Sequence, residues 1–234
     1  MLTPRARLSP VRVLAVETST LAGGVALLDG ERLRGEYLLD VRATHSERLM
    51  PAIDRLLADA GWVPGDLEGL AVAVGPGSFT GLRIGLSAVK GLALALAIPI
   101  AGVPTLDAMA AALPFADLPV CPVIDARKGE VYASLYRWDG EGMRREWEYL
   151  AVPPEALAAR IAEPVILVGD AAGAIETPHA RLAPPHRRVP SPSAVGVLGL
   201  ARLAAGETVS VADLVPIYLR PSEAELKRRV AAVN

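Results

Sequence analysis

The sequence predicts an α/β protein built from two similar lobes. Three observations carry this prediction. Short apolar runs typical of strands alternate with helical patterns, the order β-β-β-α-β-α occurs twice, and each half contains an Asp-Gly hairpin signal. The chain has 234 residues, of which 52% are hydrophobic and 21% charged, so it can bury a sizeable core. The same composition excludes an intrinsically disordered protein.

The first half is expected to open with three strands. Residues 11–17 form a short β-branched run, and residues 23–28 and 33–39 form two further apolar runs. Asp29-Gly30 separates the second run from the third. This dipeptide predicts a tight hairpin, because both turn positions favour positive φ.

A helix is expected next. Thr44 and Glu47 have the spacing of a capping box, and apolar residues recur at helical spacing over 49–60. Pro51 should kink this helix or delay its start. The rest of the first half is expected to contain strands at 70–74 and 100–103, a helix at 81–97 and a helix capped by Thr105.

The second half repeats this order. Residues 120–126 predict a strand, residues 130–138 its partner, and Asp139-Gly140 a hairpin before a strand at 145–150. The shared register and the shared order of elements favour a duplicated unit. The two hairpins align residue for residue: Asp29, Gly30, Glu31, Arg34 and Glu36 with Asp139, Gly140, Glu141, Arg144 and Glu146. A helix at 154–161, a strand at 165–168 and helices at 171–175 and 193–205 complete the half.

The lobe boundary is expected between residues 106 and 117, where prolines flank a loop. The predicted organisation is a loose N-terminal extension at 1–10, a first lobe at 11–106, and a second lobe with a C-terminal segment at 107–234. Paired α/β lobes commonly hold a nucleotide in the cleft between them, as in actin-like ATPases and sugar kinases. This comparison concerns the fold and settles no function.

Charge and cysteine content exclude several classes. The net charge of −2 gives no basic field that could hold nucleic acid through phosphates alone. The single cysteine, Cys121, excludes a disulfide framework and makes a reducing, cytoplasmic setting the expectation. No apolar run resembling a signal peptide follows Met1. The most apolar stretch, 82–101, is broken by Arg83 and Lys90, so no membrane contact is expected.

The most distinctive motif is GPGSFTGLR at residues 75–83, which follows a strand and opens a helix. Glycines let a ligand approach the backbone, and a helix N-terminus favours anions. The candidate anion or nucleotide contacts are Thr18, Gly77, Ser78, Thr80 and Arg83. The alternative is a tight strand-to-helix turn with Thr80 as N-cap. The run matches neither common phosphate-binding fingerprint.

Residues of catalytic type are sparse. Glu17 and Asp125 end corresponding strands, and such a pair could hold Mg²⁺ through water, although acids that merely cap loops are more common. The three histidines, at 45, 179 and 186, form no zinc-binding pair, so neither a metal site nor a metalloprotease is expected. No nucleophile elbow occurs, and Cys121 lies in an apolar strand. No catalytic residue is therefore assigned.

The helix at 81–97 is apolar around most of its circumference, with small residues along one side, including Gly81, Gly85 and Ala88. Such a helix must be covered on both faces. We therefore expect a helix–helix interface with another subunit, which Ala88→Glu should abolish; the alternative is a central core helix. The expected contact residues are Ser46, Leu49, Ile53, Leu82, Leu86, Val89 and Ala93.

These motifs closely resemble the TsaB family, the accessory proteins of bacterial tRNA threonylcarbamoyladenosine synthesis. The resemblance spans residues 11–221, and the glycine-rich run is highly specific for this family and its catalytic relative TsaD. The matching segments are VLAVETST (13–20), HSERLMP (45–51), GPGSFTGLR (75–83), IDARKGEVY (124–132) and PIYLR (216–220).

The resemblance implies an actin-like fold and a non-catalytic subunit that pairs with a TsaD-like catalytic subunit through first-lobe helices. It also implies a TsaE-like ATPase in the complex, a homodimer through the same helices, indirect tRNA contact, and ATP and Mg²⁺ only within the complex. Glu17 departs from the family's usual Asp, which weakens any direct Mg²⁺–nucleotide role. The alternatives are an actin-like kinase and a peptidase, for which the residues offer no nucleophile.

Overall fold

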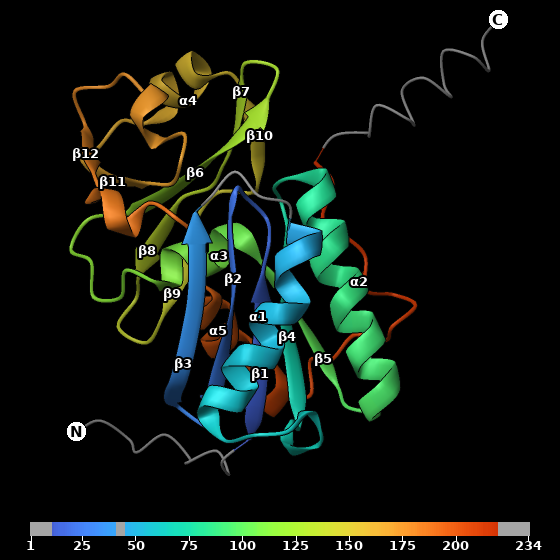
Figure 1. Ribbon diagram of the computed structural model, residues 1–234. Helices are drawn as coiled ribbons and strands as arrows, with labels where there is room; N and C mark the ends of the chain where they lie inside the picture. Colours follow the sequence, from blue (N-terminus) through green and yellow to red (C-terminus); the bar gives the residue numbers. More distant parts are fainter. Residues whose placement is uncertain (1–10, 41–44, 220–234) are drawn as a thin grey trace, which may run out of the picture.

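The computed structural model describes residues 11–40 and 45–219, which form two β-sheets with helices on their faces (Figure 1). The first sheet has the order β3-β2-β1-β4-β5. β2 runs antiparallel to β1 and β3, whereas β4 and β5 run parallel to β1. Its strands are β1 (Arg12–Glu17), β2 (Ala22–Asp29), β3 (Arg32–Asp40), β4 (Gly69–Gly75) and β5 (Ile100–Pro104).

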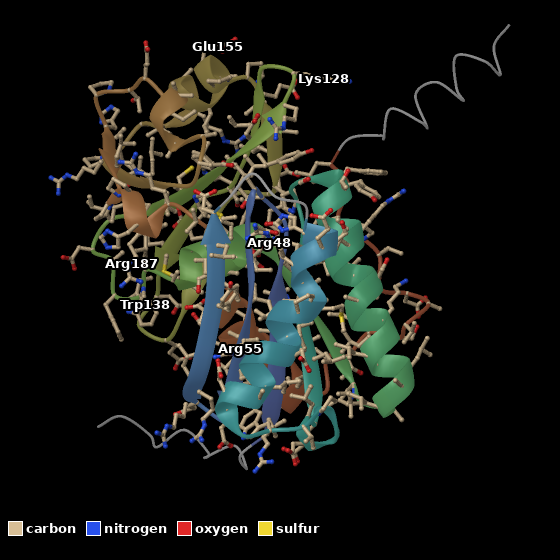
Figure 2. The ribbon with its side chains drawn as sticks, in the orientation of Figure 1. Arg48, Arg55, Lys128, Trp138, Glu155 and Arg187 are labelled. Carbon is tan, nitrogen blue, oxygen red and sulfur yellow. The ribbon has the colours of Figure 1, made fainter. Side chains whose placement is uncertain are left out.

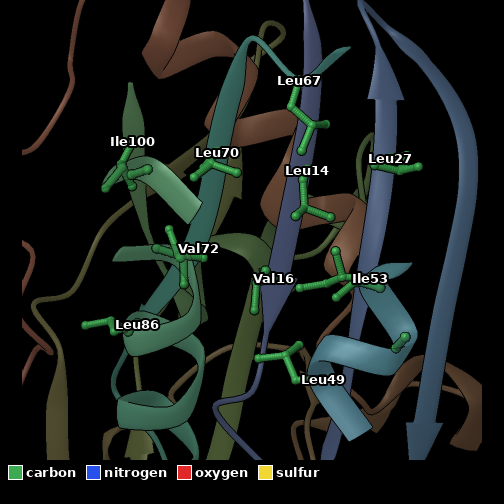
Figure 3. Packing of buried hydrophobic residues seen from close by; sticks show 14 of the residues in the cluster. Leu14, Val16, Leu27, Leu49, Ile53, Leu67, Leu70, Val72, Leu86 and Ile100 are labelled. Carbon is green, nitrogen blue, oxygen red and sulfur yellow. The ribbon is translucent and has the colours of Figure 1, made fainter. Parts of the chain in front are cut away.

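Helices cover both faces of the first sheet. α1 (His45–Ala60) and α2 (Phe79–Leu96) pack on one face, and α5 (Pro192–Ala204) packs on the other. Figure 3 shows the first of these cores, in which Leu49 and Ile53 of α1 and Leu86 of α2 meet the apolar side chains of the strands. A short 3-10 helix, η1 (Pro64–Asp66), lies between α1 and β4.

The second sheet repeats this topology with the order β10-β7-β6-β11-β12. β7 is antiparallel to β6 and β10, whereas β11 is parallel to both β6 and β12. The strands in this order are β6 (Val120–Arg127), β7 (Glu130–Ala133), β10 (Leu150–Val152), β11 (Val165–Val168) and β12 (Ala180–Leu182), and two further strands join the sheet beside β6. The predicted α/β class and duplicated unit are thereby confirmed.

The second core has two sides. α4 (Pro154–Arg160) packs on one side through Leu157. α3 (Thr105–Ala111) lies between the lobes, because Leu106 and Met109 join the second core while Ala108 joins the α5 side of the first. Two further 3-10 helices are η2 (Ala172–Ala174) and η3 (Pro185–Arg187).

The hairpin at Asp139-Gly140 has a different role from the one predicted. It joins β8 (Tyr136–Trp138) to β9 (Met143–Arg145), an insertion between β7 and β10, and is not the counterpart of the β2–β3 hairpin. The loops also differ: Asp29 pairs with Arg32 across two residues, whereas Trp138 pairs with Met143 across four. The predicted strands at 130–138 and 145–150 are therefore each replaced by shorter pieces.

The expected domain limits need one correction, because the first lobe is built from two stretches of chain. α5 contacts β1, β2, β4 and β5 of the first sheet. Beyond it, the Val209 N–H donates to the Ile100 carbonyl and the Ile217 N–H donates to the Val74 carbonyl. Leu214 is buried in the first core. The described part of the expected C-terminal segment therefore packs on the first lobe.

Helix starts differ in detail from the predictions. α1 begins at His45, so Pro51 lies inside it and does not delay its start, whereas the expected cap Thr44 falls outside the described residues. α2 begins at Phe79 with Ser78 as its N-cap, not Thr80. Thr105 is the first residue of α3 rather than its cap.

Candidate functional site

The glycine-rich loop before α2 packs directly against the turn that ends β1. The Ser78 N–H donates to the Ser19 carbonyl at 2.6 Å. The Ser78 Oγ accepts a bond from the Gly81 N–H at 3.3 Å, which caps α2. Two of the amides that the sequence offered for anion binding are therefore used within the protein.

Three glycines permit this close approach of two backbone segments. A Cβ at Gly77 would overlap the Ser19 carbonyl oxygen, and one at Gly81 would overlap the Thr18 carbonyl oxygen. A Cβ at Gly85, one turn further along α2, would overlap the Thr18 hydroxyl. The glycines make room for the chain itself, and Gly81 and Gly85 face this turn rather than another subunit.

Three buried polar side chains lie at the end of β1. Glu17 is fully buried, and its Oε1 accepts a hydrogen bond from the Ser19 N–H. Within the described residues, the Glu17 Oε2, the Thr18 Oγ1 and the Ser19 Oγ have no hydrogen-bond partner. Burial raises the pKa of Glu17 to about 7, because a carboxylate loses its hydration there. Burial therefore favours the protonated form of this carboxyl relative to an exposed glutamate.

The corresponding turn of the second lobe is open. Asp125 is exposed and holds both the backbone N–H and the guanidinium of Arg127, at 2.7 and 3.2 Å. Its own N–H donates to Asp170 Oδ1 at 3.0 Å. Arg127 and Lys128 both adopt positive φ. Figure 2 places Lys128 at the outer tip of the second lobe and Arg48 near the start of α1. The hydrogen bonds given above for Glu17 and Asp125 all lie within the lobe of each acid.

Six of the seven expected contact residues lie in the core of the first lobe. Their side chains face the sheet and are no more than 5% exposed, so they offer little surface to a partner. These residues are Leu49, Ile53, Leu82, Leu86, Val89 and Ala93. Ser46 alone is exposed. The helical periodicity located the two helices, but the residues that it selected lie on the faces packed against the sheet and not on the outer faces.

The outer faces of α1 and α2 form a groove of about 560 Å³, which we call the α1–α2 groove. Met50 is 48% exposed at its rim, and Ala88 is partly buried. The groove is lined by Ser46, Leu49, Met50, Phe79, Thr80, Arg83, Ile84, Ser87 and Ala88.

An aromatic–arginine cluster lies at the end of this groove where α2 begins. The rings of Phe79 and Tyr218 stack with centroids 5.2 Å apart, and the Arg83 guanidinium lies 3.8 Å from the Phe79 centroid. The Arg83 Nε donates to the Tyr218 hydroxyl at 3.2 Å. Sequence reasoning did not assign a role to Phe79 or Tyr218, although both lie within motifs that carry the family resemblance.

The remaining candidate residues, His45 and Cys121, have structural rather than catalytic roles in their surroundings. The His45 Nε2 lies 2.8 Å from the Thr20 carbonyl oxygen, which ties α1 to the β1–β2 turn. Cys121 is buried in β6, and burial raises its pKa to about 12, so its thiol stays protonated. Within residues 11–40 and 45–219, no three His, Cys, Asp or Glu residues come together as a metal site.

α2 is long and apolar enough to cross a membrane by length and composition. In the structure it packs along the first sheet, with Leu82, Leu86 and Val89 buried in the core. Its outer side remains open, as the 71% exposure of Leu94 shows. The apolar outer surface of α2 therefore belongs to a helix that packs on the sheet with one face and leaves its other face uncovered.

Sequence comparisons place these features among known relatives. The family model described as TsaD: tRNA N6-adenosine threonylcarbamoyltransferase matches residues 40–227. The tRNA threonylcarbamoyladenosine biosynthesis protein TsaB of Bacillus subtilis is 34% identical over 225 residues, which cover 92% of this chain and 96% of that protein. The Escherichia coli protein of the same name is also 34% identical, over 90% of this chain and 95% of its own length.

Solved structures agree. YeaZ from Pseudomonas aeruginosa superposes with a TM-score of 0.78 at 32% identity, over 89% of this chain and all of that one. A protein described as similar to the peptidase YeaZ superposes at 0.77 with 30% identity, over 90% of this chain and all of that one. A 2-hydroxyisocaproyl-CoA dehydratase activator from Clostridium difficile, at a TM-score of 0.50 and 10% identity over 84% of this chain and 97% of that one, shares the fold alone.

Proposed function

The chain belongs to the TsaB family of tRNA threonylcarbamoyladenosine biosynthesis proteins, and from that premise we propose that it is a non-catalytic subunit of the complex that adds threonylcarbamoyl to the adenosine beside the anticodon. It pairs with a TsaD-like catalytic subunit through the outer faces of α1 and α2, and a TsaE-like ATPase joins them. The observation that carries this proposal is the α1–α2 groove with its exposed aromatic–arginine cluster.

The chemistry of the groove supports a protein partner. Interfaces are enriched in Phe, Tyr, Met and Arg, and their binding energy is concentrated in a few such residues. Phe79, Tyr218 and Met50 are all at least one-third exposed, and Arg83 is already oriented by its contacts to both rings. A prearranged cluster loses little side-chain entropy when a partner covers it.

The packing of the glycine-rich loop supports a role without a nucleotide of its own. The backbone of the Thr18–Ser19 turn occupies the space beside Gly77 and Gly81, and Ser78 uses both its amide and its hydroxyl internally. The neighbouring Glu17 is fully buried, and its Oε1 accepts the Ser19 N–H, so this carboxyl is engaged within the protein. ATP and Mg²⁺ therefore enter the proposal only through the partner subunits in the complex.

The proposed tRNA contact rests on the net charge of the chain, and the proposed homodimer rests on its apolar surface. The net charge of −2 favours indirect rather than direct tRNA contact. In the absence of the partner, the apolar α1–α2 groove would be covered by a second copy, giving a homodimer that uses the same face. We place this function in the cytoplasm, with no membrane contact.

The test is an Ala88→Glu variant, because Ala88 lines the groove on α2. A charge buried without a partner at an interface costs about 3–5 kcal/mol, so pairing should weaken more than 100-fold. Ala159→Glu makes the same change on the exposed side of α4 and is the matched control. Pairing is measured by size-exclusion chromatography with light scattering after mixing with the cognate TsaD-like protein, and tRNA modification is measured in parallel.

The expected result is a hetero-complex with the wild type and with Ala159→Glu, and none with a folded Ala88→Glu. A Phe79→Ala variant should weaken pairing without introducing a charge. Normal pairing by both groove variants would refute this interface. Threonylcarbamoyl transfer by the isolated chain, or tight ATP binding to it, would refute the non-catalytic role.

A further inference from the structure

A second cavity lies between the lobes, away from the α1–α2 groove. Its volume is about 640 Å³, within the range of ligand-binding pockets. α3 and α5 form one side and the β8–β9 hairpin the other. Because α5 packs on the opposite face of the first sheet from α1 and α2, a partner on the α1–α2 groove would leave this cavity free.

One carboxylate organises the cavity wall. The hydroxyls of Tyr136 and Tyr149 both donate to Asp107 Oδ1, at 2.6 and 2.8 Å, and the Arg145 guanidinium lies 4.0 Å from the same oxygen. Burial and the Asp107 charge raise the pKa of both tyrosines, so both hydroxyls remain donors. Within the described residues, these contacts all reach Oδ1 and leave Oδ2 available to a ligand.

Two arginines line the same wall, and each is positioned by a contact within the protein. Arg145 lies over the Tyr149 ring, 4.3 Å from its centroid. Arg202 on α5 donates from one guanidinium nitrogen to the Gly102 carbonyl at 2.8 Å, which tethers its head group at the cavity. The remaining donors of both guanidinium groups suit a carboxylate.

The second acid is Glu207, just beyond α5. Its N–H donates to the Arg202 carbonyl at 2.9 Å, which fixes the turn that brings its exposed side chain to the cavity. The wall thus carries two formal positive charges and two formal negative charges. Met143, Leu198 and Ala111 add apolar surface to the same cavity.

From this arrangement we propose that the interlobe cavity binds a small zwitterion with an apolar body, such as a free amino acid or a short peptide. Its carboxylate would bind Arg145 and Arg202, and its ammonium group would bind Asp107 and Glu207. The ligand would contact α5 of the first lobe and β9 of the second at once. This site is independent of the proposed pairing with a TsaD-like subunit.

The experiment is isothermal titration calorimetry on the full chain with L-phenylalanine. Two analogues each lack one charge: N-acetyl-L-phenylalanine has no cation, and L-phenylalanine amide has no anion. Each missing ion pair should weaken binding at least tenfold. The dipeptide Ala-Phe separates the two sources, and binding tighter than that of L-phenylalanine assigns the site to a peptide.

Variants locate the site. Glu207→Gln and Arg145→Gln should each weaken binding of L-phenylalanine at least fivefold. The matched controls are Glu155→Gln on α4 and Arg144→Gln, whose residues do not line the cavity. Glu207 lies outside every helix and strand and its side chain is exposed, so this variant keeps the test valid if Arg145→Gln is destabilised.

Three results would overturn the proposal. The first is no binding of L-phenylalanine or Ala-Phe up to about 10 mM, a Kd that corresponds to less than about 3 kcal/mol. The second is binding of both singly charged analogues as tight as that of L-phenylalanine. The third is unchanged binding by the folded Glu207→Gln and Arg145→Gln variants. Failure here would leave pairing through the α1–α2 groove unaffected, because the two experiments use different surfaces and different readouts.

Discussion

The two lobes share one strand topology and differ in the segments that connect their strands. After β4 the chain enters a glycine-rich loop and an 18-residue helix, whereas after β11 it makes only the short turn η2. The first lobe also has the 16-residue α1, where the second has the 7-residue α4. Two equivalent sheets thus support two different surfaces. Strand pairing fixes the fold, and the helices added to the first lobe create the outer face available to a partner.

The largest expected effect tests the closed loop of the first lobe. Gly77→Ala forces a Cβ against the Ser19 carbonyl and should destabilise the chain by about 3 kcal/mol, because two backbone segments must separate. Gly173→Ala after β11 is the matched change in the second lobe. Open space surrounds that position, so the free energy of unfolding should change by less than about 0.5 kcal/mol. Urea denaturation measures both.

Equal effects of Gly77→Ala and Gly173→Ala would contradict the contrast between the lobes. If both changes in the free energy of unfolding were small, the loop could move off the Thr18–Ser19 turn at little cost. The space beside Gly77 would then be open to a ligand, and the proposal of a chain without its own nucleotide would lose its main support.

Sequence alone predicted the fold better than the surface. Hydrophobic periodicity predicted the duplicated unit and α2, because burial on a sheet leaves a regular pattern. The same pattern cannot separate a helix side that faces its own sheet from one that faces a partner, so Leu86 and Val89 were expected at an interface but lie in the core. The place of α5 was missed because chain order suggested the second lobe, whereas its packing depends on long-range contacts.

The candidate site shows the same limit. The glycine-rich motif was identified from sequence, but glycine permits approach of a ligand and approach of the chain itself equally well. Only the contacts between Ser78 and Ser19 distinguish the two. The aromatic–arginine cluster joins Phe79 to Tyr218, which are far apart in sequence, so no local pattern could reveal it.

The next prediction concerns the buried acid of the first lobe. The pKa of Glu17 is about 7 in the folded chain, against the ordinary glutamate value of 4.5. The folded state therefore binds more protons than the unfolded state in this range, and stability should fall as pH rises from about 4.5 to about 7, by about 3 kcal/mol in full. Glu17→Gln removes the ionisation and should flatten this dependence.

The measurement is the urea midpoint and slope at several pH values between about 4.5 and 8, the range in which the two states differ in bound protons. Asp125→Asn at the corresponding strand end is the matched control, and it should retain the dependence that Glu17 produces. The wild type and Glu17→Gln are compared by how steeply their stability changes with pH. This comparison is not affected by the pH-independent cost of placing an amide in the same buried site. A Glu17→Gln chain with the wild-type dependence would show that the carboxyl is hydrated in solution.

The smallest expected effect tests which lobe holds α5. Ser191 caps α5 by accepting the Ala194 N–H at 3.3 Å, and its hydroxyl donates to Glu36 Oε1 on β3 at 2.8 Å. Ser191→Ala should cost about 1 kcal/mol, the usual value of an N-cap. Glu36 also accepts the Ser193 N–H at 2.8 Å, so the first-lobe sheet and the start of α5 share one carboxylate.

A double-mutant cycle makes this link quantitative. Ser191→Ala and Glu36→Ala should be non-additive by about 0.5 kcal/mol or more, because both remove the same bond. Ser134→Ala, which breaks a hydroxyl bond to the Trp147 carbonyl in the second lobe, should add to Glu36→Ala without coupling. Coupling confined to the first pair would show that α5 is stabilised as part of the first lobe. Additivity in both pairs would leave α5 held by apolar packing alone, since its polar link to β3 would then contribute nothing measurable.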